Sequence, residues 1–253
     1  MSETVDASPT QKLLANLDLA GLGPDEFEGD PGEGQGPLFG GMVAAQSTVA
    51  ACRTVELERR LHSLHAYFLR PGRHGVPIRF TVDRIRDGRS FTTRRVNAEQ
   101  AGETIFSLAA SFCLAEEGIA HQEPMPDAPP PERFPDFDTE RARILDGPPP
   151  RLGAIEIRMV DPWSTEKTPP RQRSWVRIRG ALPDDPIVHV AMLVYLSDRT
   201  LLGTAARPHG IPWSKRMNAS LDHTLWFHHP VRLDDWLLYV TESPIAQSAR
   251  GLS

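Results

Sequence analysis

One aspartate stands out in this sequence because it follows the most apolar stretch of the chain. Residues 187–196 are apolar except for His189, and Asp198 comes two positions later. Burial disfavours the charged form of a carboxylate, and so does the negative end of a helix dipole. Unless the chain simply reaches solvent there, such a carboxylate needs a hydrogen-bonding partner or a chemical role, for example as the acceptor of a proton.

A serine and several histidines form a second set of candidates. Ser220, Asp222 and His223 fall in one predicted strand, where alternation sends Ser220 and Asp222 to one face and His223 to the other. We therefore do not expect these three residues to form a Ser-His-Asp triad among themselves. The remaining histidines of this set are expected to pack or to form hydrogen bonds rather than to bind a metal: His62, His65, His228 and His229.

Two adjacent glycines offer a third kind of chemistry. Gly40 and Gly41 open an apolar segment rich in alanine, residues 40–55, which we predict to be a buried helix. Uncovered backbone amides at the positive end of a helix can bind an anion or a carbonyl oxygen. Close packing of the helix start explains the same glycines, and both explanations can hold.

The element that carries Asp198 has a clear start. Asp185 can accept hydrogen bonds from free backbone amides, and Pro186 loses nothing at the first helical position. The run that follows leaves no polar face for water, so we expect this helix to be buried all round. A shorter amphipathic helix is predicted for residues 11–19.

Strands surround both apolar helices. After the first helix the alternating pattern and the turn signals predict an antiparallel meander, in which the arginines of the returning strand 91–98 face out. Its strands are residues 61–69, 78–85, 91–98 and 104–114. The second helix is preceded by predicted strands 155–160 and 174–178 and followed by 220–227 and 236–241.

The chain divides into two similar halves. Residues 116–150 are rich in proline and acid without a sustained period, which indicates a partly extended linker on the surface. It separates residues 1–115 from 151–253, and HSLHAYFLRPG and DHTLWFHHPVR follow the two helices at equivalent places. We infer two copies of one α+β unit, each an antiparallel sheet wrapped around a central helix.

Composition excludes several classes of protein. A net charge of -5 gives no reason to expect a nucleic-acid partner. Cys52 and Cys113 lie in separate apolar segments without metal-binding spacing, which indicates thiols in a reducing compartment. The first residues lack the apolar core of a signal peptide, and no apolar run is long enough to span a bilayer. We therefore expect a cytoplasmic protein.

A series of collinear segments resembles the acyl-CoA thioesterase II family, the double-hotdog thioesterases. The segments are PLFGGMVAAQ, LHSLHAYFLRPG, DRIRDGRSFTTRRV, SDRTLL, LDHTLWFH and DDWLLYVTES, within residues 37–251. The resemblance implies a double hotdog that hydrolyses fatty acyl-CoA to free acid and coenzyme A. It implies no metal ion, no cofactor and no covalent intermediate. Since a double hotdog often pairs again, we also expect a homo-oligomer.

The resemblance carries particular roles onto this sequence. Enzymes of the family hold the attacking water with an Asp, a Ser or Thr, and a Gln. The aspartate matches Asp198, and the hydroxyl matches Ser220, where many relatives have Thr. Gln46 matches a family glutamine on the first helix, and we expect it to contact the substrate together with Gly40 and Gly41.

The catalytic glutamine of the family matches no residue of this chain. It belongs to a final strand after the SARG segment, whereas Gln247 comes earlier. We expect this strand in a further C-terminal segment of roughly 25 to 35 residues, or else a short form that has lost catalysis.

Two other functions stay open, and so does the coenzyme A site. A hotdog enoyl-CoA hydratase would share the fold but would release no free thiol, and a non-catalytic acyl-CoA binding protein would fit the unmatched glutamine. Arg70, Arg94 and Arg95 could meet coenzyme A phosphates, although solvated strand faces explain them equally well.

Overall fold

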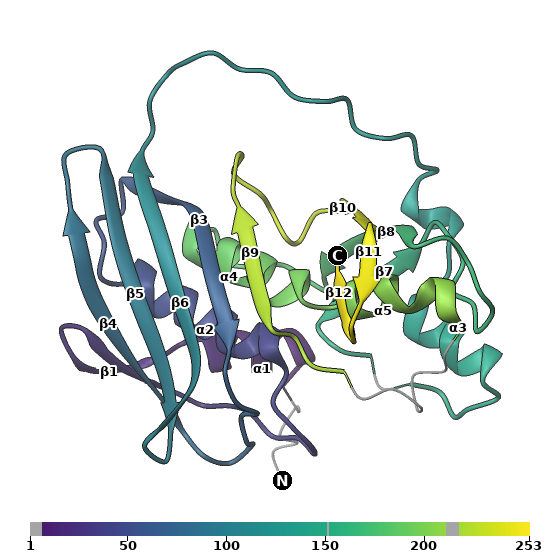
Figure 1. The fold of residues 1–253 in the computed structure, drawn as a ribbon, viewed down its shortest axis with the longest axis horizontal. Helices are drawn as coiled ribbons and strands as arrows, with labels where there is room; N and C mark the ends of the chain where they lie inside the picture. Colours follow the sequence, from purple (N-terminus) through teal and green to yellow (C-terminus); the bar gives the residue numbers. More distant parts are fainter. Residues whose placement is uncertain (1–6, 151, 211–217) are drawn as a thin grey trace, which may run out of the picture.

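Two helices lie side by side at the centre of the molecule, and antiparallel sheets flank them (Figure 1). The computed structural model describes residues 7–150, 152–210 and 218–253. The central helices are α2 (Gly40–Cys52) and α4 (Pro186–Ser197), and the start of α2 lies against the end of α4. Both helices were predicted, and so was the shorter α1 (Pro9–Leu17), which Ser8 caps.

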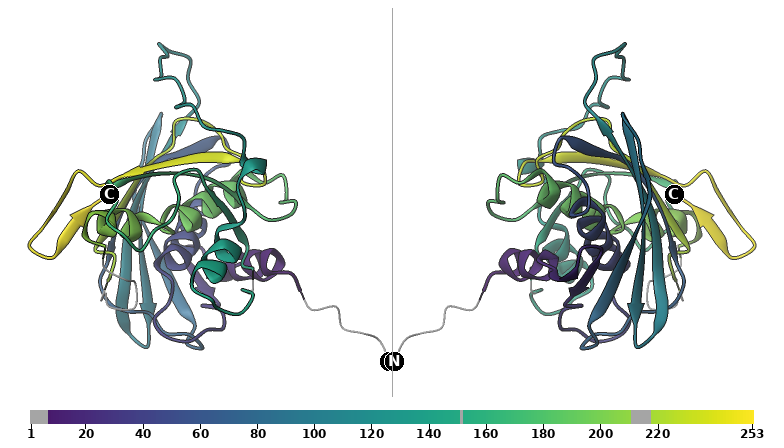
Figure 2. Two further views of the ribbon diagram at one scale, coloured as in Figure 1. Left: turned by 90° about the vertical axis from the view of Figure 1, so that its right-hand side faces the viewer. Right: turned by 90° about the vertical axis from the view of Figure 1, so that its left-hand side faces the viewer.

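The larger sheet contains all four strands of the predicted meander. Its strand order is β1-β2-β4-β5-β6-β3-β9, and every neighbouring pair is antiparallel. Figure 2 shows the long strands on one side of the molecule and the helices on the other. The bounds are β1 (Ala20–Gly23), β2 (Glu26–Gly29), β3 (Arg59–Phe68), β4 (Ile78–Asp87), β5 (Phe91–Gln100), β6 (Glu103–Leu114) and β9 (Asp222–Trp226). Because β9 pairs with β3, this sheet joins the two halves of the chain.

One arginine of β5 contradicts the prediction that the arginines of this strand face out. Arg95 is exposed, but only 2% of Arg94 is exposed. Arg94 donates to the hydroxyl of Thr54 at 3.0 Å and to the carboxylate of Asp87 at 2.5 Å. These bonds satisfy the guanidinium, which would otherwise make its burial unfavourable.

The second half of the chain forms a smaller sheet of order β10-β8-β7. Its strands are β7 (Ile155–Met159), β8 (Arg171–Ile178) and β10 (Leu237–Glu242), which agree with the prediction to within a few residues. A hairpin of β11 (Ile245–Gln247) and β12 (Arg250–Leu252) was not predicted. Its turn residues, Ser248 and Ala249, both have positive φ, a conformation that serine and alanine do not signal in sequence.

Helix α4 begins as predicted but is not buried all round. Asp185 accepts a hydrogen bond from the amide of Ile187 at 2.8 Å. Ala191 and Met192 are fully buried, whereas Leu193 is only partly buried. Sheets enclose a helix completely only where they continue around it, and no strand of the described residues joins β9 to β10.

The predicted linker carries helical structure of its own. After crossing from β6 to the second half of the molecule (Figure 1), it forms η1 (Pro131–Arg133) and α3 (Phe137–Ile144). Asp136 caps α3 by accepting from the amides of Asp138 and Thr139. The sequence predicted a partly extended linker, but it did not predict these two helical segments. The other helices among the described residues are α5 (Leu201–Ala206) and η2 (Arg207–His209). No helix in the described ranges has the length and hydropathy that crossing a membrane requires.

Candidate active site

A cavity of about 780 Å³ lies where the two central helices meet the linker. Its wall comes from the start of α2, the end of β3, the start of β6, α3 and the chain that follows α4. Four of the five candidate residues raised by the sequence belong to or border this cavity: Gly40, Gly41, Asp198 and Ser220.

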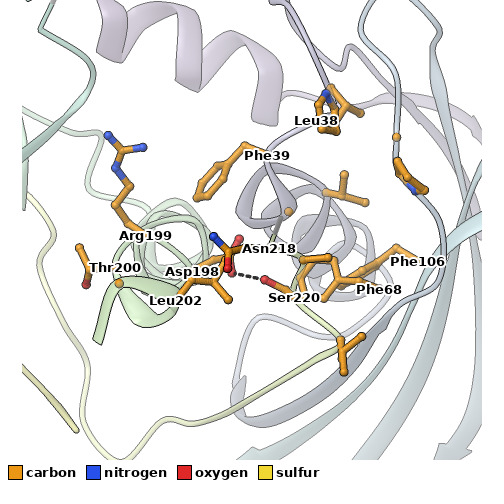
Figure 3. Close-up of a pocket in the computed structure, with 18 of the residues that line it drawn as sticks. Leu38, Phe39, Phe68, Phe106, Asp198, Arg199, Thr200, Leu202, Asn218 and Ser220 are labelled. Atoms are coloured by element: carbon orange, nitrogen blue, oxygen red, sulfur yellow. Dashed lines mark hydrogen bonds between the residues drawn. The ribbon is translucent and has the colours of Figure 1, made fainter. Parts of the chain in front are cut away.

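Asp198 ends α4 and at the same time caps the start of α2. Its Oδ2 accepts from the amide of Gly41 at 2.9 Å, and its Oδ1 accepts from the hydroxyl of Ser220 at 3.2 Å (Figure 3). The residue at the N-cap of α2, Phe39, has no side-chain acceptor, so the carboxylate from the other helix satisfies this end of the dipole. Each oxygen thus has one fixed donor, which orients the carboxylate in the cavity wall.

The environment raises the pKa of Asp198 above its ordinary value. Burial has the largest effect, and it outweighs the opposite effects of nearby His223 and of the hydrogen bonds from Ser220 and Gly41. A carboxylate with a raised pKa is a stronger base and accepts a proton more readily. The arrangement can therefore hold a water molecule and take its proton.

The two glycines serve close packing, as one of the two explanations predicted. A Cβ on Gly41 would lie 2.5 Å from the carbonyl oxygen of Tyr195, and one on Gly40 would lie 3.0 Å from Oδ2 of Asp198. The amide of Gly41 is used by Asp198, so it is not free for a substrate oxygen. The amide of Gly40 makes no hydrogen bond within the described residues and remains a donor beside the cavity.

Gln46 lies apart from the cavity. Its side chain is fully buried, and its Nε2 donates to the carbonyls of Asn16 and Asp30, both at 2.7 Å. These bonds hold the end of α1 and the loop after β2 against α2. The side chain is therefore committed to the fold, and the structure does not bring it to the other candidate residues.

Two residues that the sequence did not single out for this role hold Ser197, the neighbour of Asp198. Ser197 Oγ lies 2.8 Å from Nε2 of His223, and the hydroxyl of Tyr239 donates to the Ser197 carbonyl at 2.8 Å. Since Ser197 Oγ donates its own hydrogen to the carbonyl of Val194, Nε2 of His223 is the donor in their contact. Burial lowers the pKa of His223, which favours a neutral imidazole with its hydrogen on Nε2.

The expected separation of Ser220 and His223 on opposite strand faces is wrong. Strand β9 begins only at Asp222, so alternation does not extend back to Ser220. Both side chains reach the end of α4, Ser220 at Asp198 and His223 at Ser197. Ser220 and His223 form no hydrogen bond with each other in the described part of the chain. The prediction that Ser220, Asp222 and His223 form no triad therefore holds, but the reason is not strand alternation: each of the two side chains binds a different residue at the end of α4.

Of the three arginines considered from sequence, only Arg70 lines the cavity. Arg94 is buried beneath the sheet, and Arg95 is exposed on β5. Two arginines that were not considered, Arg141 and Arg199, also line the wall. Among the described residues, no group of three or more His, Cys, Asp or Glu side chains is arranged to hold a metal ion.

Comparison with known proteins gives consistent matches along the chain. A family model described as acyl-CoA thioesterase matches residues 156–253, and one described as acyl-CoA thioesterase N-terminal domain matches residues 30–113. Acyl-coenzyme A thioesterase 8 of Mus musculus is 40% identical over 233 residues, which cover 85% of this chain and 73% of that protein.

Solved structures share the fold. The crystal structure of an acyl-CoA thioesterase II, TesB2, from Mycobacterium marinum is 41% identical, with a TM-score of 0.78 over 94% of this chain and 88% of that one. A protein with a hotdog fold from Alicyclobacillus acidocaldarius is 22% identical and has a TM-score of 0.76, over 93% of this chain and 87% of that one. These likenesses confirm the α+β double-hotdog architecture that the sequence predicted.

Proposed function

The chain belongs to the acyl-CoA thioesterase II family and is a thioester hydrolase, and we propose that it cleaves fatty acyl-CoA with a water molecule held by Asp198 and Ser220. The observation that carries this proposal is the carboxylate of Asp198, which lines the cavity with both oxygens fixed by donors. The glutamine implied by the family resemblance matches no residue of this sequence, so the proposal rests on these two side chains.

Each residue has a defined part in the proposed reaction. Asp198 takes a proton from the water as the oxygen attacks the thioester carbonyl carbon, and Ser220 holds that water through its free lone pairs. The amide of Gly40 faces the carbonyl oxygen as it gains negative charge. The carbon–sulfur bond then breaks, the sulfur leaves as the thiol of coenzyme A with the proton from Asp198, and the acid is released.

The cavity supports a fatty acyl group as the substrate. Phe68 and Phe106 are in ring contact, with centroids 5.1 Å apart, and both line the wall together with Phe39 and Val43. Figure 3 shows Phe68 and Phe106 beside Ser220. Apolar side chains next to the proposed water site fit a hydrocarbon chain, because burying that chain removes its surface from water.

Thiol release from an acyl-CoA series tests the proposal. We expect the wild-type protein to release free coenzyme A, and Asp198→Asn to lower kcat by about 100-fold or more, because general-base catalysis contributes that much. Asp83→Asn, an exposed carboxylate on β4, is the matched control and should keep normal turnover. Water addition to enoyl-CoA without thiol release would instead support a hydratase, and tight binding without turnover would support a binding protein.

A further inference from the structure

Arginines gather where the cavity opens to solvent. Arg70, Arg141 and Arg199 are exposed and also line the cavity, so they lie at its mouth. Arg70 is committed elsewhere, because it donates to the carbonyl of Thr104 at 2.7 Å and lies 3.9 Å from the carboxylate of Glu103. Within the described residues, Arg141 and Arg199 have no acidic partner.

The linker is fixed in place before it presents Arg141. Asp136, at the start of α3, is paired with Arg179, and Arg158 donates to the carbonyls of Pro131 and Phe134 at 3.2 and 3.3 Å. Arg158 is itself held by the buried carboxylate of Glu156 at 2.8 Å. This network binds the segment before α3 to the smaller sheet, so α3 has a defined position at the cavity.

The pattern of α3 explains which residue faces the cavity. Phe137 and Arg141 are four residues apart, so they share one face of the helix. Both line the cavity, and Phe137 packs edge-on against Trp163 with ring centroids 6.5 Å apart. The aromatic contact fixes the rotation of α3, which turns Arg141 toward the opening.

The proposed water site lies between Arg199 and a pair of phenylalanines. Figure 3 shows Arg199 across the Asp198–Ser220 pair from Phe68 and Phe106. A thioester whose carbonyl carbon lies at Asp198 and whose acyl chain lies against the phenylalanines must extend its thiol part the other way. That direction leads toward Arg199.

We propose that Arg141 of the linker helix and Arg199 after α4 bind the phosphate groups of the nucleotide part of coenzyme A, which makes the linker a component of the substrate site. This inference rests on the proposed function, in which the substrate is an acyl-CoA. Guanidinium groups suit the task because their planar donors match phosphate oxygens in pairs. Asp138 also lines the wall and opposes the phosphates, so its carboxylate weakens the site.

Two thioesters with the same acyl chain separate this role from catalysis. Acyl-CoA carries the phosphates of the nucleotide, whereas acyl-pantetheine lacks them. For Arg141→Ala and for Arg199→Ala we expect kcat/KM with acyl-CoA to fall about tenfold through KM, because each loses a charge-assisted hydrogen bond. With acyl-pantetheine both variants should match the wild type within about twofold. Asp138→Asn should lower KM for acyl-CoA only.

Arg84→Ala is the control, because Arg84 is paired with Asp25 on the far edge of the large sheet and should leave both substrates unchanged. Equal losses on both thioesters, or no loss on acyl-CoA, would overturn the inference. Calorimetric binding of free coenzyme A and of pantetheine gives a readout that needs no turnover. If no thioester is cleaved but the arginine variants still weaken coenzyme A binding selectively, the proposed function fails and this inference stands.

Discussion

Gly41 donates its backbone N–H to Oδ2 of Asp198 across 157 residues of chain, so the end of one central helix caps the start of the other. The bond joins the two halves of the double hotdog at the cavity. It also explains why a carboxylate is tolerated at the end of an apolar helix, since the positive end of α2 compensates the unfavourable end of α4. The geometry of this site therefore depends on how the two halves pack against each other.

The raised pKa of Asp198 predicts the acidic side of the pH profile. A general base works only when deprotonated, so kcat/KM should rise with pH through a midpoint above the ordinary carboxyl value of 3.8. Ser220→Ala removes a hydrogen bond that lowers this pKa, so its midpoint should lie higher still, with kcat reduced about tenfold. Steady-state rates across pH measure both. A midpoint for Ser220→Ala at or below that of the wild type contradicts this account.

The same pKa shift predicts a gain in stability when the charge is removed. The folded protein binds the Asp198 proton more tightly than the unfolded chain, so the free energy of unfolding falls as pH rises through the shifted pKa. Asp198→Asn carries no charge and does not lose this stability, so it should unfold at a higher denaturant concentration than the wild type at neutral pH, although its kcat should be lower. The difference should vanish at pH values below the ordinary carboxyl pKa. Equal unfolding midpoints for the wild type and Asp198→Asn at both pH values would contradict this prediction.

Local chemistry made parts of this arrangement predictable from sequence. The start of α4 follows from Asp185 and Pro186, whose preferences act within one turn. The pairing of Asp198 with Ser220 came from family resemblance, because no local rule joins residues 22 positions apart. The role of Gly41 as donor to Asp198 could not be anticipated, since it depends on how two helices from different halves pack.

Long-range partners also explain the sequence-based errors. An arginine in an alternating strand looks solvated, and only the distant Thr54 reveals that Arg94 points inward. No residue of helix α3 is buried, and its few apolar residues form no clear amphipathic pattern, so the sequence shows no buried face. The helix forms where the smaller sheet binds Asp136 through Arg179, which the sequence does not show.

The two glycines of α2 predict a split between stability and activity. In Gly41→Ala the new methyl would meet the backbone carbonyl of Tyr195, so we expect about 1 to 3 kcal/mol lower stability as well as loss of activity. In Gly40→Ala it would meet the ring of Phe68 and the carboxylate of Asp198, so activity should fall more than stability. Chemical denaturation and thiol release measure the two effects. Gly21→Ala, which has open space around it, is the control, and equal behaviour of all three variants would refute the packing argument.

Tyr239 should act on catalysis through Ser197 rather than through substrate. Its hydroxyl donates to the carbonyl of Ser197, one residue before Asp198. Tyr239→Phe keeps the ring but removes this hydrogen bond, so the last turn of α4 is held less firmly. We expect kcat to fall about threefold to tenfold with KM nearly unchanged, because one neutral hydrogen bond is lost. His223→Gln, which can still donate to Ser197 Oγ, should lose less activity than His223→Ala. Tyr67→Phe, an exposed tyrosine on β3, is the matched control. An increase in KM with unchanged kcat would place Tyr239 at the substrate instead.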